Sequence, residues 1–220
     1  MSQHEHEGHR DHGHQEHAHP SSDDPSPPEE SVLLEAALRE LLIEKGVITG
    51  EELRIAMEAM DARGEGVGAK IVARAWSDPA YKQLLLQSPA EAIAKFGLGM
   101  GVNELCVVEN TDRLHNVIVC TLCSCYPRMI LGIPPAWYKS REYRSRVVRE
   151  PRAILAEFGT RLPDNVEVRV HDSTADLRYL VLPIRPSRTD GWSEEALAAL
   201  VSRDSMIGTA LARTPGQVER

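Results

Sequence analysis

The chain has 220 residues, of which 42% are hydrophobic, and this is enough apolar material for one large domain with a buried core. Its formal net charge of −8 argues against nucleic acid or an anionic membrane as the main partner, because both carry negative charge themselves. No apolar run approaches the ~20 residues of a membrane span and no signal-peptide pattern opens the chain, so we expect a soluble protein of the cytoplasm.

The first thirty residues form a histidine-rich segment with almost no apolar side chains. It holds seven of the nine histidines. Such a composition cannot bury enough surface to fold alone, so residues 1–30 are predicted to be a disordered tail. Imidazole is a common metal ligand, and a weak metal-gathering role is one interpretation of this tail. A solvated linker without any metal role is the other.

A helical arm is predicted for residues 31–97. Apolar residues at helical spacing follow Ser31, which can cap the first helix, and Gly46 can end it. Thr49 and Glu52 have the spacing of a capping box at the start of a second helix. Further helical stretches follow after a glycine-rich break, so this half of the chain is predicted to be helical throughout.

An α+β domain is predicted for residues 98–212, followed by a short C-terminal tail of residues 213–220. Four runs have the composition of strands: "ELCVVEN", "LHNVIVC", "VEVRVHD" and "LRYLVLP". A proline-rich turn and a charged helical stretch separate the second run from the third. The expected fold class is therefore α+β, with a helical N-terminal arm and an α/β-layered C-terminal domain whose strands are antiparallel.

Three of the four cysteines lie within six positions, at the exit of the second predicted strand: Cys120, Cys123 and Cys125. Structural zinc is one candidate for this cluster, but the chain has no second Cys-x-x-Cys pair. His115 or His171 would have to complete the ligand set. A thioredoxin-type redox pair and an iron–sulfur cluster are further candidates, although the βαβ unit of the first and the wider spacing of the second are missing.

The Cys-Ser-Cys spacing allows another kind of metal site. Cys123 and Cys125 can bind one ion through sulfur while the backbone amides of Ser124 and Cys125 face the same ion. If both amides lose their protons, the tripeptide becomes a planar four-donor chelate. Cys120 would add an axial ligand and leave one position open, as a catalytic metal requires. Deprotonated amides need a strongly polarising ion, so cobalt(III) or iron(III) fits better than zinc.

The stretch "VCTLCSC" resembles the metal claw of the nitrile hydratase α subunit. Other stretches resemble that family in the same order, between about Ser31 and Ala212: "GAKIVARAWSDP", "LGIPPAWYKSREYRSRVVREPRAILAEFG" and "VHDSTADLRYLVLPIRP". In this family the residue after the first cysteine tracks the metal, with threonine accompanying cobalt and serine accompanying iron. Thr121 therefore implies one non-corrin cobalt(III) ion in the chain, with iron less favoured.

The resemblance implies that Cys120, Cys123 and Cys125 bind the metal through sulfur, and Ser124 and Cys125 through amide nitrogen. It implies that Cys123 is oxidised to a sulfinate and Cys125 to a sulfenate. The implied partners are a cobalt activator protein and a β-type subunit, or two chains in its place, whose arginines hold the sulfur-bound oxygens. The implied activity is a lyase reaction that hydrates a small-molecule nitrile to its amide, and only in complex with the partner. Water, hydroxide on the metal and the sulfenate oxygen are the candidate nucleophiles.

One residue departs from the nitrile hydratase pattern. Arg128 lies in a segment where most members carry tryptophan, and here it resembles the γ subunit of thiocyanate hydrolase, a cobalt enzyme that forms carbonyl sulfide and ammonia. A guanidinium group suits an anionic substrate. Because "IPPAWYK" and "RDSMIG" resemble nitrile hydratases, nitrile hydration is our first expectation and thiocyanate hydrolysis the second. A zinc-stabilised interaction module is a distant third. The expected catalytic residues are Cys123, Ser124, Cys125 and Arg128.

Other residues have two interpretations each. Asp172, Asp176 and Arg178 belong to a strand–turn–strand that the family places near the cysteines, where they would support the ligands, or they form a local ion pair in a turn. His115 is expected to be a structural histidine on a strand. Tyr138 either lines a pocket or belongs to the core, and we favour the core.

Overall fold

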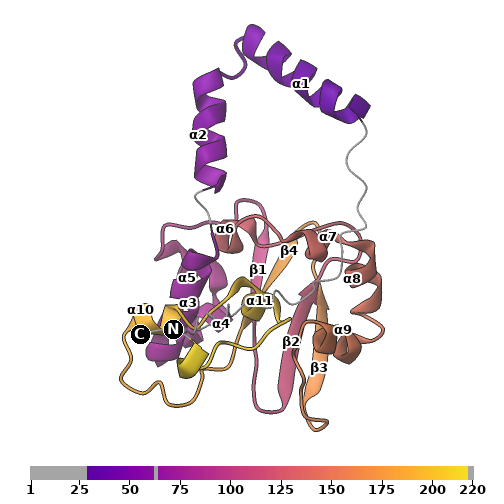
Figure 1. Cartoon of the computed structure of the whole chain (residues 1–220). Coiled ribbons are helices and arrows are strands. Elements are labelled where there is room, and N and C mark those ends of the chain that lie inside the picture. Colours follow the sequence, from indigo (N-terminus) through magenta and orange to yellow (C-terminus); the bar gives the residue numbers. More distant parts are fainter. Residues whose placement is uncertain (1–28, 62–63, 218–220) are drawn as a thin grey trace, which may run out of the picture.

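The computed structural model describes residues 29–61 and 64–217, and the histidine-rich segment of residues 1–28 lies outside the described residues. Two helices, α1 (Glu29–Glu44) and α2 (Gly50–Asp61), stand away from the rest of the chain (Figure 1). The predicted capping box is confirmed, since the backbone N–H of Thr49 donates to the Glu52 carboxylate at 2.8 Å and that of Glu52 donates to the Thr49 hydroxyl at 3.1 Å. No residue of α1 is buried, so its apolar stripe faces outward.

The remaining helices pack around two pairs of short strands (Figure 1). Within the described residues, no helix is long and apolar enough to cross a membrane. In chain order the elements are α3 (Glu65–Ser77), α4 (Pro79–Gln87), α5 (Pro89–Ala94), β1 (Glu104–Glu109), β2 (Leu114–Val119), α6 (Arg128–Leu131), α7 (Ala136–Lys139), α8 (Arg141–Arg146), α9 (Pro151–Glu157), β3 (Glu167–Asp172), β4 (Leu177–Leu182), α10 (Glu194–Ala198), α11 (Arg203–Ile207) and a 3-10 turn (Pro215–Gln217).

Helices α3, α4 and α5 contribute to the same hydrophobic core as the strands. Ile71 of α3, Leu85 of α4 and Ile93 of α5 are fully buried in one cluster with Leu180 of β4. Burying side chains of this size stabilises the fold by roughly 1.5–3 kcal/mol each. The division between a helical arm and a catalytic domain at residue 97 stays a prediction, and the core extends across it.

The four predicted strands are confirmed, but their predicted antiparallel direction is wrong. β1 pairs with β4 and β2 pairs with β3, and both pairs are parallel. The short turns 110–113 and 173–176 look like hairpin turns in sequence, yet each one connects a strand of one pair to a strand of the other. The long segment from residue 120 to residue 166, which carries α6 to α9, provides the crossover that a parallel pair needs.

This pairing fixes where the cysteines lie. Val119 at the end of β2 is opposite Asp172 at the end of β3, so both strands leave the sheet at the same edge. Cys120 follows immediately, and residues 120–125, called the cysteine loop below, begin beside the turn that follows β3. The loop therefore begins at the end of β2, a buried and hydrogen-bonded strand, and lies next to the end of β3.

The backbone of α11 approaches β2 so closely that only glycine fits at the contact. Gly208 ends this helix with φ +93°, a conformation that L residues rarely adopt. A β-carbon added there would lie 2.0 Å from the carbonyl oxygen of Asn116 in β2. The strand that leads to the cysteine loop is thus in direct backbone contact with the C-terminal part of the chain.

Gly208→Ala should therefore lower the free energy of unfolding by about 3 kcal/mol or more, because it adds both backbone strain and a collision with β2. Urea denaturation followed by circular dichroism measures this change. Gly66→Ala is the control, since a β-carbon there meets nothing within 4 Å and helix propensity favours alanine by about 1 kcal/mol. Equal stability of the Gly208 variant and the wild type would contradict the close approach.

Candidate metal centre

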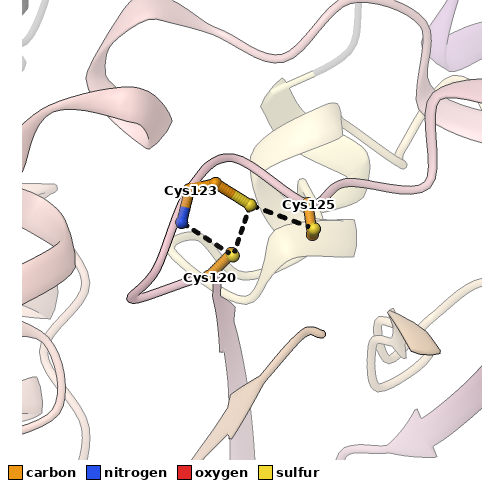
Figure 2. A group of neighbouring side chains, drawn as sticks. All are labelled: Cys120, Cys123 and Cys125. Atoms are coloured by element: carbon orange, nitrogen blue, oxygen red, sulfur yellow. Dashed lines mark hydrogen bonds between the residues drawn. The ribbon is translucent and has the colours of Figure 1, made fainter. Parts of the chain in front are cut away.

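The three sulfurs of the cysteine loop converge on one point (Figure 2). The sulfur of Cys123 lies 3.4 Å from that of Cys120 and 3.2 Å from that of Cys125. The backbone N–H of Cys123 donates to the Cys120 sulfur at 3.3 Å, which folds the loop back onto its first residue. Within the described part of the chain, these cysteines form the one group of three or more histidine, cysteine or acidic side chains that is compact enough to hold a metal ion.

Exposure differs sharply along the loop. Cys120 is buried at the end of β2, with 1% of its surface exposed, whereas Cys123 is exposed and Cys125 is half-buried. All of them are free thiols. The loop thus has a buried anchor on the strand and two sulfurs that a ligand or a partner can reach.

Neither histidine proposed as a fourth zinc ligand belongs to the cluster. His115 bonds through Nε2 to the carbonyl oxygen of Gly208 at 2.7 Å, and burial lowers the pKa of its imidazole. His171 bonds through Nε2 to the side-chain oxygen of Asn116 at 2.8 Å. The expected structural role of His115 is confirmed, and a closed four-ligand zinc site finds no fourth donor among residues 29–61 and 64–217.

The hydrogen bonds among the three sulfurs change the acidity of the exposed thiol. The pKa of the Cys123 thiol is lowered by its hydrogen bonds with Cys125 and Cys120, and the backbone N–H groups of Ser124 and Cys125 add to this effect. The three sulfurs thus surround one small volume. Soft sulfur donors suit a transition-metal ion, so the residues present fit the cobalt that the sequence implied.

A carboxylate from the neighbouring strand holds the loop near its start. Asp172, at the end of β3, accepts hydrogen bonds from the backbone N–H of Thr121 at 2.9 Å and from its hydroxyl at 2.6 Å. Asp176 instead belongs to the turn before β4, where its carbonyl oxygen accepts a hydrogen bond from the backbone N–H of Glu104. Of the two acidic candidates, the structure thus brings Asp172 to the loop and places Asp176 in the turn.

Side chains from α7 and α8 hold the loop from another direction. The hydroxyl of Tyr138 donates to the carbonyl oxygen of Cys125 at 2.9 Å, so this residue belongs to the core, as expected, and also contacts the loop. Arg144 donates from Nη1 to the carbonyl oxygen of Cys123 at 3.1 Å. Neither contact could be predicted from sequence, because the accepting atoms are backbone carbonyl oxygens that every residue carries.

A cavity of about 510 Å³ opens beside the loop. Arg128 and Arg178 line it together with the loop residues Cys123, Ser124 and Cys125. The structure thus places Arg128 at the same cavity as the cysteine loop, while its catalytic role stays a prediction. The cavity is completed by Gly99, Met100, Gly101, Asn103, Tyr126 and Met129.

A family model described as nitrile hydratase, alpha chain, matches residues 29–210. The chain therefore belongs to the nitrile hydratase α-chain family. It is 50% identical over 185 residues to the α subunit of the high-molecular-weight cobalt-containing nitrile hydratase of Rhodococcus rhodochrous, covering 83% of this chain and 91% of the relative. This agreement confirms the resemblance seen in the cysteine loop.

Two further comparisons concern a relative with a different activity and a relative with a different metal. The γ subunit of thiocyanate hydrolase from Thiobacillus thioparus is 45% identical over 196 residues, covering 84% of this chain and 80% of that subunit. A solved structure, a double mutant of the Fe-type nitrile hydratase from Comamonas testosteroni Ni1, superposes with a TM-score of 0.79 at 40% identity. That match covers 86% of this nitrile hydratase-like chain and 94% of the solved one.

The two accessible thiols should differ in reactivity in the metal-free protein. Hydrogen bonds with the other two sulfurs hold the pKa of Cys123 below its usual value, whereas burial raises the pKa of Cys125 to about 12. Because the thiolate is the nucleophile, iodoacetamide at pH 8 should modify Cys123 at least about ten-fold faster than Cys125. Peptide mass spectrometry measures both rates.

The pH dependence follows from the same shifts. The rate at Cys123 should rise at a lower pH than the rate at Cys125, which should keep rising as the pH approaches 12. Cys106, whose pKa is raised by burial alone, is the internal control. Equal rates at Cys123 and Cys125 across this range would contradict the geometry of the loop.

Proposed function

We propose that this chain is the cobalt-bearing α subunit of a nitrile hydratase, which converts a nitrile to the corresponding amide. One observation carries the proposal: three cysteine sulfurs converge in a Cys-Thr-Leu-Cys-Ser-Cys loop beside a cavity of about 510 Å³. A cavity of this size suits a small organic substrate.

The loop would hold the ion through the sulfurs of Cys120, Cys123 and Cys125 and the amide nitrogens of Ser124 and Cys125. Cobalt(III) bound there supplies the Lewis acidity that makes a nitrile carbon electrophilic toward water. Thr121 supports cobalt over iron, and so does the 50% identity to the α subunit of a cobalt-containing nitrile hydratase.

The chain's own residues would divide the remaining work between them. Cys120 is buried and directly follows the end of β2, so the start of the loop is held in place by a paired strand. Cys123 and Cys125 line the cavity, where oxidation to sulfinate and sulfenate would place oxygen atoms next to the substrate. Arg128 and Arg178 line the cavity, where their positive charge would attract the polar end of the substrate.

The active enzyme would also need a β-type partner subunit, present as one chain or as two. The exposure of the loop supports this, because Cys123 is exposed and 89% of Leu122 is accessible. An apolar side chain at the tip of a functional loop is typical of a surface that another protein covers. The partner's arginines would then bind the oxidised cysteine oxygens, and an activator protein would deliver cobalt through the same exposed side.

Metal analysis tests the proposal directly. The complex purified with its partner should contain about one cobalt ion per copy of this chain, because the described residues offer a single cluster of sulfur donors. The peptide spanning residues 120–125 should carry the added mass of a sulfinate and a sulfenate. Cys123→Ser should abolish cobalt retention. Stoichiometric zinc with unmodified cysteines would refute the enzyme assignment in favour of a zinc-stabilised interaction module.

A second candidate function is thiocyanate hydrolysis, and the cavity charge favours it specifically. Arg128 and Arg178 place two cationic groups around the proposed substrate position, which suits an anion better than a neutral nitrile. The 45% identity to the thiocyanate hydrolase γ subunit is consistent with this candidate. Nitrile hydration remains first because the cobalt nitrile hydratase relative is the more similar of the two.

Parallel assays decide between the two substrates. In the first assay the complex should form amides from nitriles, which chromatography measures. In the second assay thiocyanate is the substrate, and the release of ammonia is measured. Arg128→Leu should lower kcat/KM at least about ten-fold more for thiocyanate than for a neutral nitrile, because only the anion loses a charge partner. Turnover of thiocyanate without turnover of any nitrile would transfer the assignment to the second candidate.

A further inference from the structure

Two buried tyrosines hold the two ends of the cysteine loop. Tyr143 of α8 donates its hydroxyl to the carbonyl oxygen of Ile118 at 2.8 Å, just before the first cysteine. Tyr138 of α7 donates its hydroxyl to the carbonyl oxygen of Cys125 at 2.9 Å, at the last cysteine. The entry and the exit of the loop are thereby attached to the same short segment of chain.

This segment is rigid for reasons that lie in its own sequence. Both tyrosine rings are fully buried, and they pack against each other with ring centres 5.9 Å apart. Trp137 packs edge-on against Tyr143 at 4.9 Å. The buried Ser140 caps α8 by accepting a hydrogen bond from the backbone N–H of Tyr143 at 3.1 Å, which fixes the angle between the two helices. The hydroxyls are thus presented from fixed positions.

A third contact from the same segment reaches the middle of the loop. Arg144 donates to the carbonyl oxygen of Cys123, and this oxygen shares one planar peptide unit with the backbone nitrogen of Ser124. Fixing the direction of that carbonyl therefore fixes the direction of the Ser124 amide. The hydroxyls of the two tyrosines and the guanidinium group of Arg144 donate hydrogen bonds, and the Asp172 carboxylate accepts one from Thr121. These contacts define the shape of the loop with protein atoms alone.

We propose that Tyr138 and Tyr143 are positioning residues that hold the cysteine loop in its metal-binding shape before cobalt arrives. This inference rests on the proposed function of the loop as the cobalt site. A site that is already ordered loses less conformational entropy when the ion binds, so the ion is retained more strongly and lost more slowly. The tyrosines act through the backbone of Cys125 and Ile118 and do not contact the metal.

Amide hydrogen exchange in the metal-free full chain tests the role of the hydroxyls. Tyr138→Phe keeps the ring and removes one hydrogen bond, so the amides of residues 120–126 should exchange at least about five-fold faster, the factor that a typical net hydrogen bond corresponds to. Tyr143→Phe should give the same local effect, centred on the start of the loop. The second variant keeps the test valid if either substitution impairs folding.

Tyr81→Phe is the matched control. The hydroxyl of Tyr81 in α4 is also buried and also donates to a backbone carbonyl, that of Ala92, at 3.2 Å. Its removal should lower overall stability to a similar extent and leave exchange in the cysteine loop at the wild-type rate. Equal acceleration in the loop by Tyr81→Phe and Tyr138→Phe would mean that the tyrosines serve the fold only, and would overturn the inference.

Cobalt retention provides the second readout. In the complex with the partner subunit, Tyr138→Phe should release cobalt to a chelator at least about five-fold faster than both the wild type and Tyr81→Phe. Unchanged exchange together with unchanged release would overturn the inference. A wild-type chain that binds no cobalt would instead refute the proposed function, and the exchange comparison in the metal-free chain would still decide what the tyrosines do.

Discussion

The parallel pairing of β2 with β3 is the constraint on which the metal centre depends. It places Val119 opposite Asp172, so that the loop after one strand emerges beside the carboxylate at the end of the other. Cys120 is buried because it directly follows a strand that is itself fully packed, and Thr121 finds its hydrogen-bond partner on the neighbouring strand. An antiparallel pair would have brought the start of β3 to this edge and left the loop without that support.

The chemistry of the site follows from crowding three thiols on a short loop. The sulfur of Cys123 lies within hydrogen-bonding distance of the other two, which lowers the pKa of this exposed thiol, whereas burial and then the hydrogen bond with Cys123 raise the pKa of Cys125. Arg128 and Arg178 line the cavity beside these sulfurs. A loop of this kind favours a cation that can bind several thiolates at once.

Sequence alone predicted the parts of this protein that depend on neighbouring residues. The four strands, the capping box at Thr49 and Glu52, and the cluster of three cysteine sulfurs are all local patterns, and the structure has each of them. Strand direction could not be obtained in this way, because the turns 110–113 and 173–176 are short enough for hairpins and only tertiary packing decides which strands pair. The contacts of Tyr138 and Tyr143 could not be predicted for a related reason, since every residue carries a backbone carbonyl and the sequence does not show which of them accepts a hydrogen bond.

The contact between Gly208 and β2 has a consequence for the order in which the chain can fold. The strand that leads into the metal site is packed against residues near the far end of the sequence, and its other neighbour, β3, is also made late. A nascent chain that has just exposed its cysteines gains α7 and α8, which contact the cysteine loop, soon afterwards, whereas β3 and α11 follow only later in the sequence. The strand that leads into the metal site therefore acquires its last two neighbours only when the C-terminal part of the chain has been synthesised.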